Sequence, residues 1–358
     1  MNTEKPHLNQ SPLGLRYFLL VGTLFFSICF GLGYPSIKRY DPREIEGLSD
    51  AANYYLLASG GNTSTMREVF HCRVLVPFLA RPIYLIAQPY LRGWNAGFFA
   101  LLVVNSLFCA ATACITIAIG YRLFGDATLA LLGAAIYLLN FAVSNLQLAG
   151  LIDAGEACFI AALTLSLLAR RWYLLPLWGL LGALAKETFV PFATVLALVW
   201  GLVEWRKNKT TTTTLAWVLT LAVVGLATVT IVHSLIVGEP RGPWNLFERA
   251  AARHSFIGSL WKCLTERNFW YVFGWLIPFG VWRLKLFPRS LVMGCFAAAG
   301  LALLLGAWID AGGSIARSVF NVTGPLLSLS TALLIAGSKL LPNEIAQQHT
   351  SREDYSRR

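Results

Sequence analysis

Long uninterrupted apolar runs limit the possible folds of this chain more than any other feature. Several reach about twenty residues, the length that crosses a hydrocarbon core. Backbone N–H and C=O groups in lipid must be satisfied within each segment, and these runs lack the period-two alternation of barrel strands. The sequence therefore predicts an all-α protein, a polytopic transmembrane helical bundle. The clear runs are residues 15–34, 96–120, 127–145, 154–169, 215–237, 269–282, 290–308 and 318–337.

Residues 174–203 pose the main question about the number of spans. This stretch is apolar except for Lys186 and Glu187, which stand side by side in LLGALAKETFVPFA. A single helix of that length would reach roughly 45 Å and bring both charges to mid-membrane, where charges are costly. Pro191 favours a new helix just after KET, because proline is tolerated in a first turn. We therefore expect two short helices with the two charges at an outer hairpin tip.

Basic residues in the short loops indicate how the chain is oriented. With ten spans and the amino terminus inside, the loops holding Arg122, Arg170, Arg206 and Arg283 all fall on one face. The positive-inside rule makes that face cytoplasmic. The chain is thus expected in a membrane, the plasma or inner membrane in a bacterium, with both termini cytoplasmic. The predicted parts are a tail at 1–14, a transmembrane domain at 15–338 with outer loops at 35–95 and 238–268, and a tail at 339–358.

The first outer loop is patterned rather than a simple connector. Its segment GLSDAANYYLLASGG predicts a short helix that Ser49 caps and that ends at Gly60 and Gly61. Residues 74–87 form an apolar run too short for a span and interrupted by Arg81 and two prolines. We expect this juxtamembrane segment to lie along the outer surface, broken into two helices at Pro82.

Several charged residues of the expected outer face are candidates for a site. Asp50 either complements the dipole of its short helix or serves as a general base above the membrane. Asp153, in LIDAGEACF, either caps the fourth span or belongs to the site. Arg317 begins the last span, where it either snorkels or binds an anion such as phosphate. Because isolated charges at membrane level are costly, we expect Asp50, Asp153, Lys186 and Arg317 to line one outward cavity.

Composition argues against two other classes of protein. The formal net charge is +11, and lysines and arginines flanking the spans account for it, so no nucleic-acid partner is expected. The seven cysteines include no CxxC pair and no Cys/His cluster with metal-ligand spacing. Neither a metal site nor a disulfide framework is therefore predicted, and the expected surroundings of the chain are membrane lipids.

The segments SDAANYY, CRVLVPFLARP, LIDAGE and LAKETFVP together resemble the GT-C superfamily of integral-membrane glycosyltransferases, over roughly residues 15–205. These enzymes use polyprenyl-phosphate-linked sugars. Many members carry a diacidic pair in the first loop, whereas Ser49 precedes a single Asp50 here, which weighs against a divalent metal cofactor.

The resemblance implies roles for particular residues. Asp50 would be the general base that deprotonates an acceptor hydroxyl, so that the sugar transfers with inversion, and the acceptor itself stays open. The lipid phosphate would be bound by Lys186, Arg317 and Arg73. Glu187 would orient Lys186, and the supporting residues would be Glu187, Asp153 and Arg81.

Two other classes of function remain open. A transporter or flippase of a lipid-linked or anionic substrate would also gather cations, although such proteins commonly show paired broken helices in two related halves. A non-catalytic assembly subunit would use the first outer loop as a surface for a partner.

Overall fold

The computed structural model describes residues 14–39, 50–61, 66, 68–207, 212–242, 255–309 and 315–337. All regular elements in these ranges are helical, which confirms the predicted all-α class. The predicted tails, apart from Gly14, and parts of both predicted outer loops, Ser49 among them, lie outside the described residues. The helices are α1 Leu15–Arg39, α2 Ala51–Ser59, α3 Glu68–His71, α4 Leu75–Ala87, α5 Ala96–Phe124, α6 Ala127–Leu138, α7 Asp153–Leu168, α8 Leu175–Ala185, α9 Phe189–Trp205, α10 Thr212–Val237, α11 Phe256–Thr265, α12 Arg267–Phe273, α13 Leu276–Val281, α14 Arg289–Trp308 and α15 Ile315–Ile335.

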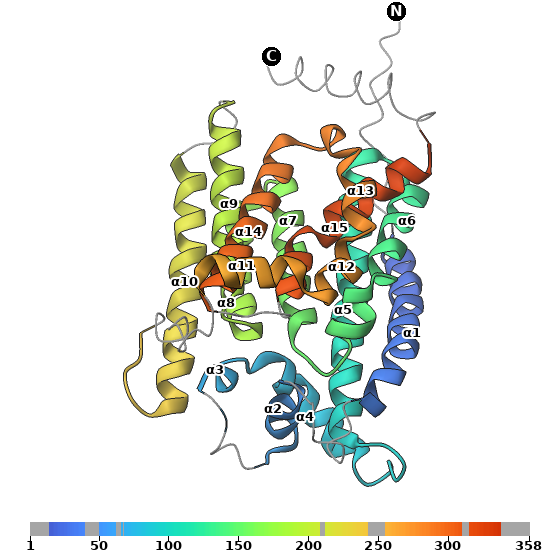
Figure 1. Cartoon of the computed structure of the whole chain (residues 1–358), viewed down its shortest axis with the longest axis vertical. Coiled ribbons are helices and arrows are strands. Elements are labelled where there is room, and N and C mark those ends of the chain that lie inside the picture. The colour runs from blue at the N-terminus through green and yellow to red at the C-terminus, as the bar shows by residue number, and fades with distance from the viewer. Residues whose placement is uncertain are drawn as a thin grey trace, which may run out of the picture.

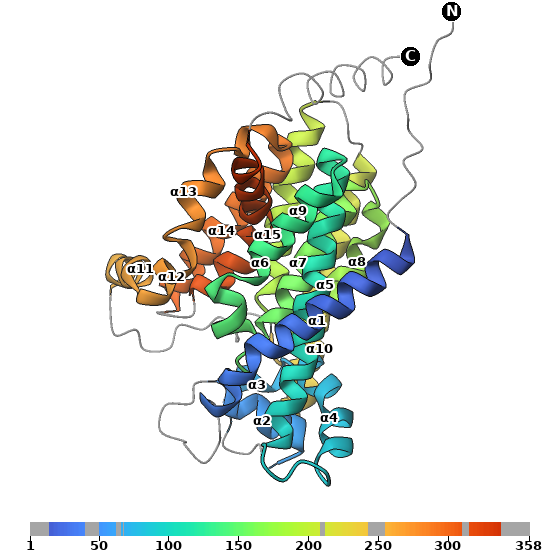
Figure 2. The same ribbon diagram turned by 90° about the vertical axis from the view of Figure 1, so that its right-hand side faces the viewer.

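Five of the described helices are long and apolar enough to cross a membrane: α1, α5, α10, α14 and α15. They indicate a membrane protein, while the count of ten spans stays a prediction. In the most apolar 18-residue window of α15, 83% of the residues are buried by the rest of the protein, whereas the share in α1 is 11%. The first is therefore a central helix and the second a peripheral one. Figure 2 shows α1 crossing α5 at a slant on the outside of the bundle.

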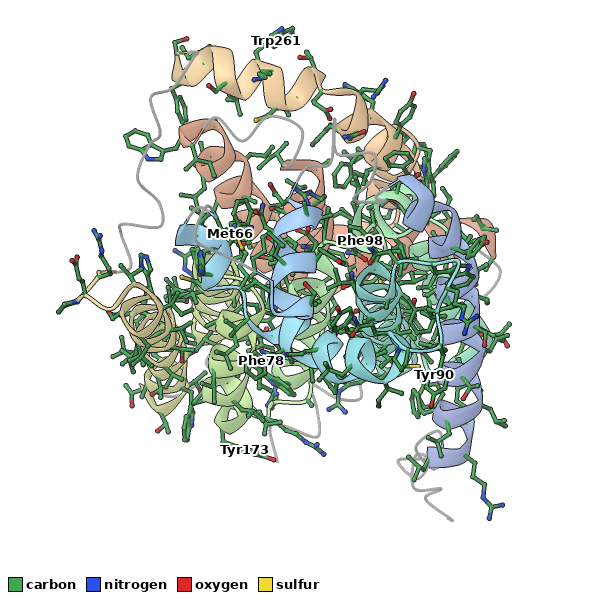
Figure 3. All side chains as sticks on the ribbon, turned by 90° about the horizontal axis from the view of Figure 1, so that it is seen from below. Met66, Phe78, Tyr90, Phe98, Tyr173 and Trp261 are labelled. Atoms are coloured by element: carbon green, nitrogen blue, oxygen red, sulfur yellow. The ribbon has the colours of Figure 1, made fainter. Side chains whose placement is uncertain are left out.

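The helices differ in length, and this difference places the site. At 1.5 Å per residue, α5 is about 44 Å long and α10 about 39 Å, whereas α7 is about 24 Å and α8 about 17 Å. The short α2, α3 and α4 gather at one end of the bundle, between the ends of α5 and α10 (Figure 1). Seen from that end, α11, which carries the labelled Trp261, lies apart from them at the edge (Figure 3).

The break at KET is confirmed. Helix α8 ends at Ala185 and α9 begins at Phe189, so Pro191 lies in the first turn of the second helix. The two helices approach closely at Gly182, where an added Cβ atom would overlap the ring of the fully buried Phe189. A glycine is required there by the hairpin itself rather than by an unusual backbone angle.

Three expected elements differ from the structure. Pro82 does not divide α4, which is continuous over Leu75–Ala87; Pro82 and Phe78 are exposed, so the Phe78 carbonyl that loses its partner is not enclosed in the core. The run 127–145 is not one helix, because the Asn140 side chain accepts a hydrogen bond from Ala142 N and turns the chain after α6. A π-helical turn, Val143–Gln147, follows.

The run 269–282 is also divided, into α12 and α13. Pro278 has no N–H group to bond the Gly274 carbonyl, and its ring crowds that carbonyl, so the first helix ends at Phe273.

The short helix in the first outer loop behaves as expected, since α2 ends at Ser59 and Gly60 follows in the left-handed conformation, with φ of 73°.

Candidate functional site

Two polar residues one turn apart, Asp50 at the start of α2 and Tyr54 within it, belong to the candidate site. Asp50 directly precedes the helix, and its side chain makes no capping hydrogen bond to the described first turn. Tyr54, one turn later, is buried, with its ring edge-on to Phe70 at 5.9 Å. Burial raises the pKa of Tyr54 to about 12, opposed by Arg73 and assisted by the negative charges of Asp50 and Glu187. The phenol therefore stays protonated at neutral pH.

Arg73 connects α2 to the α8–α9 hairpin. It lies between α3 and α4, and its Nη1 donates a hydrogen bond to the Tyr54 hydroxyl at 2.6 Å. Its Nε donates to Glu187 Oε2 at 2.8 Å, and its Nη2 donates to the other oxygen of the same carboxylate. The guanidinium carbon also lies 5.3 Å from the centre of the Phe70 ring. This is a bidentate pair, the strongest geometry that an arginine and a carboxylate form.

Lys186 forms the second ion-pair group, at the tip where α8 ends in extended backbone. Its Nζ donates to Asp153 Oδ1 at 2.7 Å and to Glu156 Oε2 at 3.0 Å. The second oxygen of Asp153 accepts a hydrogen bond from Arg317 Nη1 at 2.9 Å. Asp153 of α7 therefore links Lys186 at the hairpin tip to Arg317 of α15.

Glu156 extends this group into the centre of the bundle. Besides Lys186, it accepts hydrogen bonds from Thr188 Oγ1 at 2.5 Å and from Asn321 Nδ2 at 2.8 Å. Gln147, in the π-helical turn, donates from its Nε2 to Asn321 Oδ1 at 2.9 Å and accepts from the Tyr137 hydroxyl at 3.2 Å. A chain of buried hydrogen bonds thus runs from the hairpin tip to α6.

The charges of this cluster balance. We call "the ion cluster" the three cations and three carboxylates, all buried or half-buried, of two neighbouring groups: the Arg73–Glu187 pair and the four-residue group of Lys186, which directly precedes Glu187 in the chain. Buried charges are tolerated only when they are paired and hydrogen-bonded, and each of the six has an opposite charge within 3.0 Å. The members of the ion cluster are Arg73, Lys186, Arg317, Asp153, Glu156 and Glu187.

Most of the residues predicted for a site come together. Asp153 binds both Lys186 and Arg317, and Arg73 binds Glu187, which directly follows Lys186 in the chain. Asp50 lies one turn from Tyr54 and acts on that phenol through its charge. Arg81 lies elsewhere.

The Arg81 guanidinium lies near Gly60, 3.3 Å from where a Cβ atom on that glycine would be. This contact is at the opposite end of α2 from Asp50, about 15 Å along the helix. One pairing also differs from the expectation, because Glu187 binds Arg73, whereas Asp153 and Glu156 hold Lys186.

Four residues of the site were not assigned a role from the sequence, although a signal for three of them is present. Glu156 follows Asp153 by three positions, Asn321 follows Arg317 by four, and Tyr54 follows Asp50 by four. Residues three or four apart share a face of a helix, so each candidate pointed to its neighbour. Thr188 has no comparable signal, because it lies in the turn itself.

In the part of the chain that the structure describes, no group of three or more His, Cys, Asp or Glu side chains could hold a metal ion. The fold and the ion cluster define an all-helical membrane protein with a buried polar site near one end of its bundle. Comparison with known family models, curated proteins and solved structures finds no match to this chain.

Proposed function

We propose that this protein is a membrane glycosyltransferase that moves a sugar from a polyprenyl-phosphate donor to an acceptor hydroxyl, with inversion. The observation that carries the proposal is the connection from α2 to the hairpin tip: Tyr54, Arg73 and Glu187 join the helix of Asp50 to the segment of Lys186. The proposed reaction needs a carboxylate to take the acceptor proton and cations to stabilise the departing phosphate, and this connection joins the segments that carry them.

Asp50 is the proposed general base. Asp50 is half-buried, and its carboxylate makes no capping hydrogen bond to α2; a carboxylate held in this way is suited to act as a general base. The acceptor hydroxyl gives its proton to Asp50 while its oxygen bonds to the anomeric carbon of the sugar. The bond from that carbon to the phosphate oxygen breaks on the opposite face, and the lipid phosphate leaves as the anion.

Lys186 and Arg317 are the proposed ligands of the donor phosphate. Lys186 uses two of its three N–H donors on carboxylates, and the Arg317 guanidinium donates through Nη1 to Asp153 and is partly exposed. The remaining donors are available to a phosphate. Asp153 and Glu156 keep the two cations charged and fixed in place, so the charge that develops on the leaving phosphate is stabilised without reorganisation.

The proposed orientation puts this site on the outer face, periplasmic or luminal, with ten spans and cytoplasmic termini. Since α8 is about 17 Å long, the hairpin tip would then lie below the outer membrane surface. A lipid-linked donor could reach such a tip with its chain still in the membrane.

The test is transfer by the purified protein in nanodiscs. Incubation with a panel of polyprenyl-phosphate sugars and acceptor alcohols should release lipid phosphate. The Asp50→Asn variant should lose about a hundredfold to ten-thousandfold in rate and keep donor binding, because it lacks only the base. Glu239→Gln, at an exposed carboxylate outside the ion cluster, is the matched control and should stay active. Near-normal turnover by Asp50→Asn would overturn the role of Asp50.

One observation favours a second candidate, a transporter of a lipid-linked or anionic substrate. The ion cluster continues through Asn321 and Gln147 to Tyr137 in the bundle, and buried ionisable groups of membrane proteins often mark ion pathways. Proteoliposomes distinguish the two candidates, because a transporter would move a fluorescent lipid-linked sugar across the bilayer without releasing lipid phosphate.

A further inference from the structure

The Arg73 guanidinium is held on three sides by residues of the protein. Glu187 occupies its fork with both carboxylate oxygens, Tyr54 accepts from Nη1, and the Phe70 ring lies against its plane. A phosphate that binds through the Nε–Nη2 edge would have to displace the buried Glu187 carboxylate, because arginine binds phosphate and carboxylate in the same bidentate geometry. The three bonds leave one N–H on Nη1 and one on Nη2, so a phosphate that binds beside Glu187 would have to use these two donors.

The three partners of Arg73 come from separate parts of the chain. Tyr54 belongs to α2, and Glu187 directly follows Lys186 at the hairpin tip. Asp50 is one turn from Tyr54, so whatever fixes Tyr54 also fixes the rotation of α2 and the position of Asp50.

Helix α2 depends on such contacts. It has nine residues, too few to be a stable helix alone in water, and Ala51, Tyr54 and Ala58 form its buried face. Tyr54 is the member of that face that bonds a charged group. Breaking its bond to Arg73 should therefore loosen the whole helix.

We propose that Arg73 is a positioning residue and not a phosphate ligand. It holds α2 against the α8–α9 hairpin, so that the distance between Asp50 and Lys186 stays fixed. The clamp consists of Tyr54, Arg73 and Glu187. Its value for catalysis rests on the proposed function, because it aligns the base with the phosphate that Lys186 binds.

Hydrogen exchange tests the clamp without any substrate. In nanodiscs, the amides of residues 51–59 should exchange about tenfold faster in Arg73→Lys, which keeps the charge and loses the fork. Tyr54→Phe is the milder variant, since it keeps the ring packing on Phe70 and should accelerate the same amides.

The matched control is Tyr55→Phe. Tyr55 is next in the same helix, and its ring stacks on Phe98 at 5.3 Å, a contact that phenylalanine retains. This variant should leave the exchange unchanged. Wild-type exchange in both Arg73→Lys and Tyr54→Phe would overturn the clamp.

Kinetics separates a positioning residue from a phosphate ligand. If Arg73 positions Asp50, Arg73→Lys should lower kcat by about tenfold to a hundredfold, as small misplacements of catalytic groups do, with donor affinity unchanged. Weaker donor binding with normal exchange would overturn the proposal and make Arg73 a ligand. Faster exchange in a protein that transfers no sugar would instead support the clamp and overturn the proposed function.

Discussion

At the scale of single residues, Glu156 connects Lys186 of the ion cluster to Thr188 and Asn321. Its side chain is completely buried and accepts hydrogen bonds from an ammonium, a hydroxyl and an amide. An ionised carboxylate only accepts hydrogen bonds, so both of its oxygens can face the three donors. A carboxamide would replace one of these oxygens with an NH₂ group, which donates. The charge of this residue, not only its shape, is therefore needed.

Glu156→Gln should lower the free energy of unfolding by about 3–5 kcal/mol, because it leaves Lys186 short of charge and turns one acceptor into a donor. Thermal unfolding in detergent or nanodiscs measures the change. Thr164→Val, two turns along α7, is the control; its hydroxyl bonds back to Ile160 O within the helix, so about 1 kcal/mol or less is expected. Equal stability of the two variants would refute the role given to Glu156.

The cost of isolated charges predicted that Asp50, Asp153, Lys186 and Arg317 would line one outward cavity. Asp153 binds both Lys186 and Arg317, whereas the place of Asp50 in a shared cavity stays a prediction. That cost did not predict which carboxylate binds which cation. The sequence places Glu187 next to Lys186, but neighbouring side chains in a turn or helix point in different directions. Only the positions of α3, α4 and α7 decide that Glu187 binds Arg73 and that Lys186 binds Glu156.

At the scale of elements, the α8–α9 hairpin sets where Lys186 and Glu187 lie. Its closest approach is at Gly182, against the Phe189 ring. Gly182→Ala should therefore separate the helices and lower the free energy of unfolding by about 1–3 kcal/mol, as overpacking does.

The control for this variant is Gly300→Ala in α14, where no atom lies within 4 Å of an added Cβ. Alanine there should be neutral or stabilise by up to about 1 kcal/mol through helix propensity. Thermal unfolding of both variants is the measurement. If Gly182→Ala is as stable as Gly300→Ala, the hairpin does not need the close approach.

Local chemistry predicted some elements and misled on others. Pro191 marked the start of α9 because proline fits a first turn. The rule that a proline breaks a helix interior failed at Pro82, since an exposed helix face can tolerate the lost hydrogen bond. Nothing in the apolar composition of 127–145 revealed the turn after α6, which depends on Asn140 bonding both Ala142 N and the distant Val272 carbonyl.

At the scale of the whole molecule, the two ends of the bundle differ in kind. The α8–α9 hairpin points towards the end with α2–α4 (Figure 1), and Arg73, just before α4, binds Glu187 at the hairpin tip. The other end is reached by α9, which runs about 26 Å from the tip to Trp205 and is followed by Arg206 and Lys207. A helix bundle with basic residues at one end and a polar site at the other is expected to span the membrane with the basic end inside.

Cysteine labelling tests this orientation. In a cysteine-free background, single cysteines at Arg92, which precedes α5 at the α2–α4 end, and at Arg206 should react from opposite sides; both positions are exposed. An impermeant maleimide added to intact cells or sealed vesicles should label Arg92→Cys and spare Arg206→Cys, and permeabilisation should expose the second. Labelling of Arg206→Cys alone would reverse the orientation and place the proposed site on the cytoplasmic face. Labelling of both from one side would contradict a spanning α9.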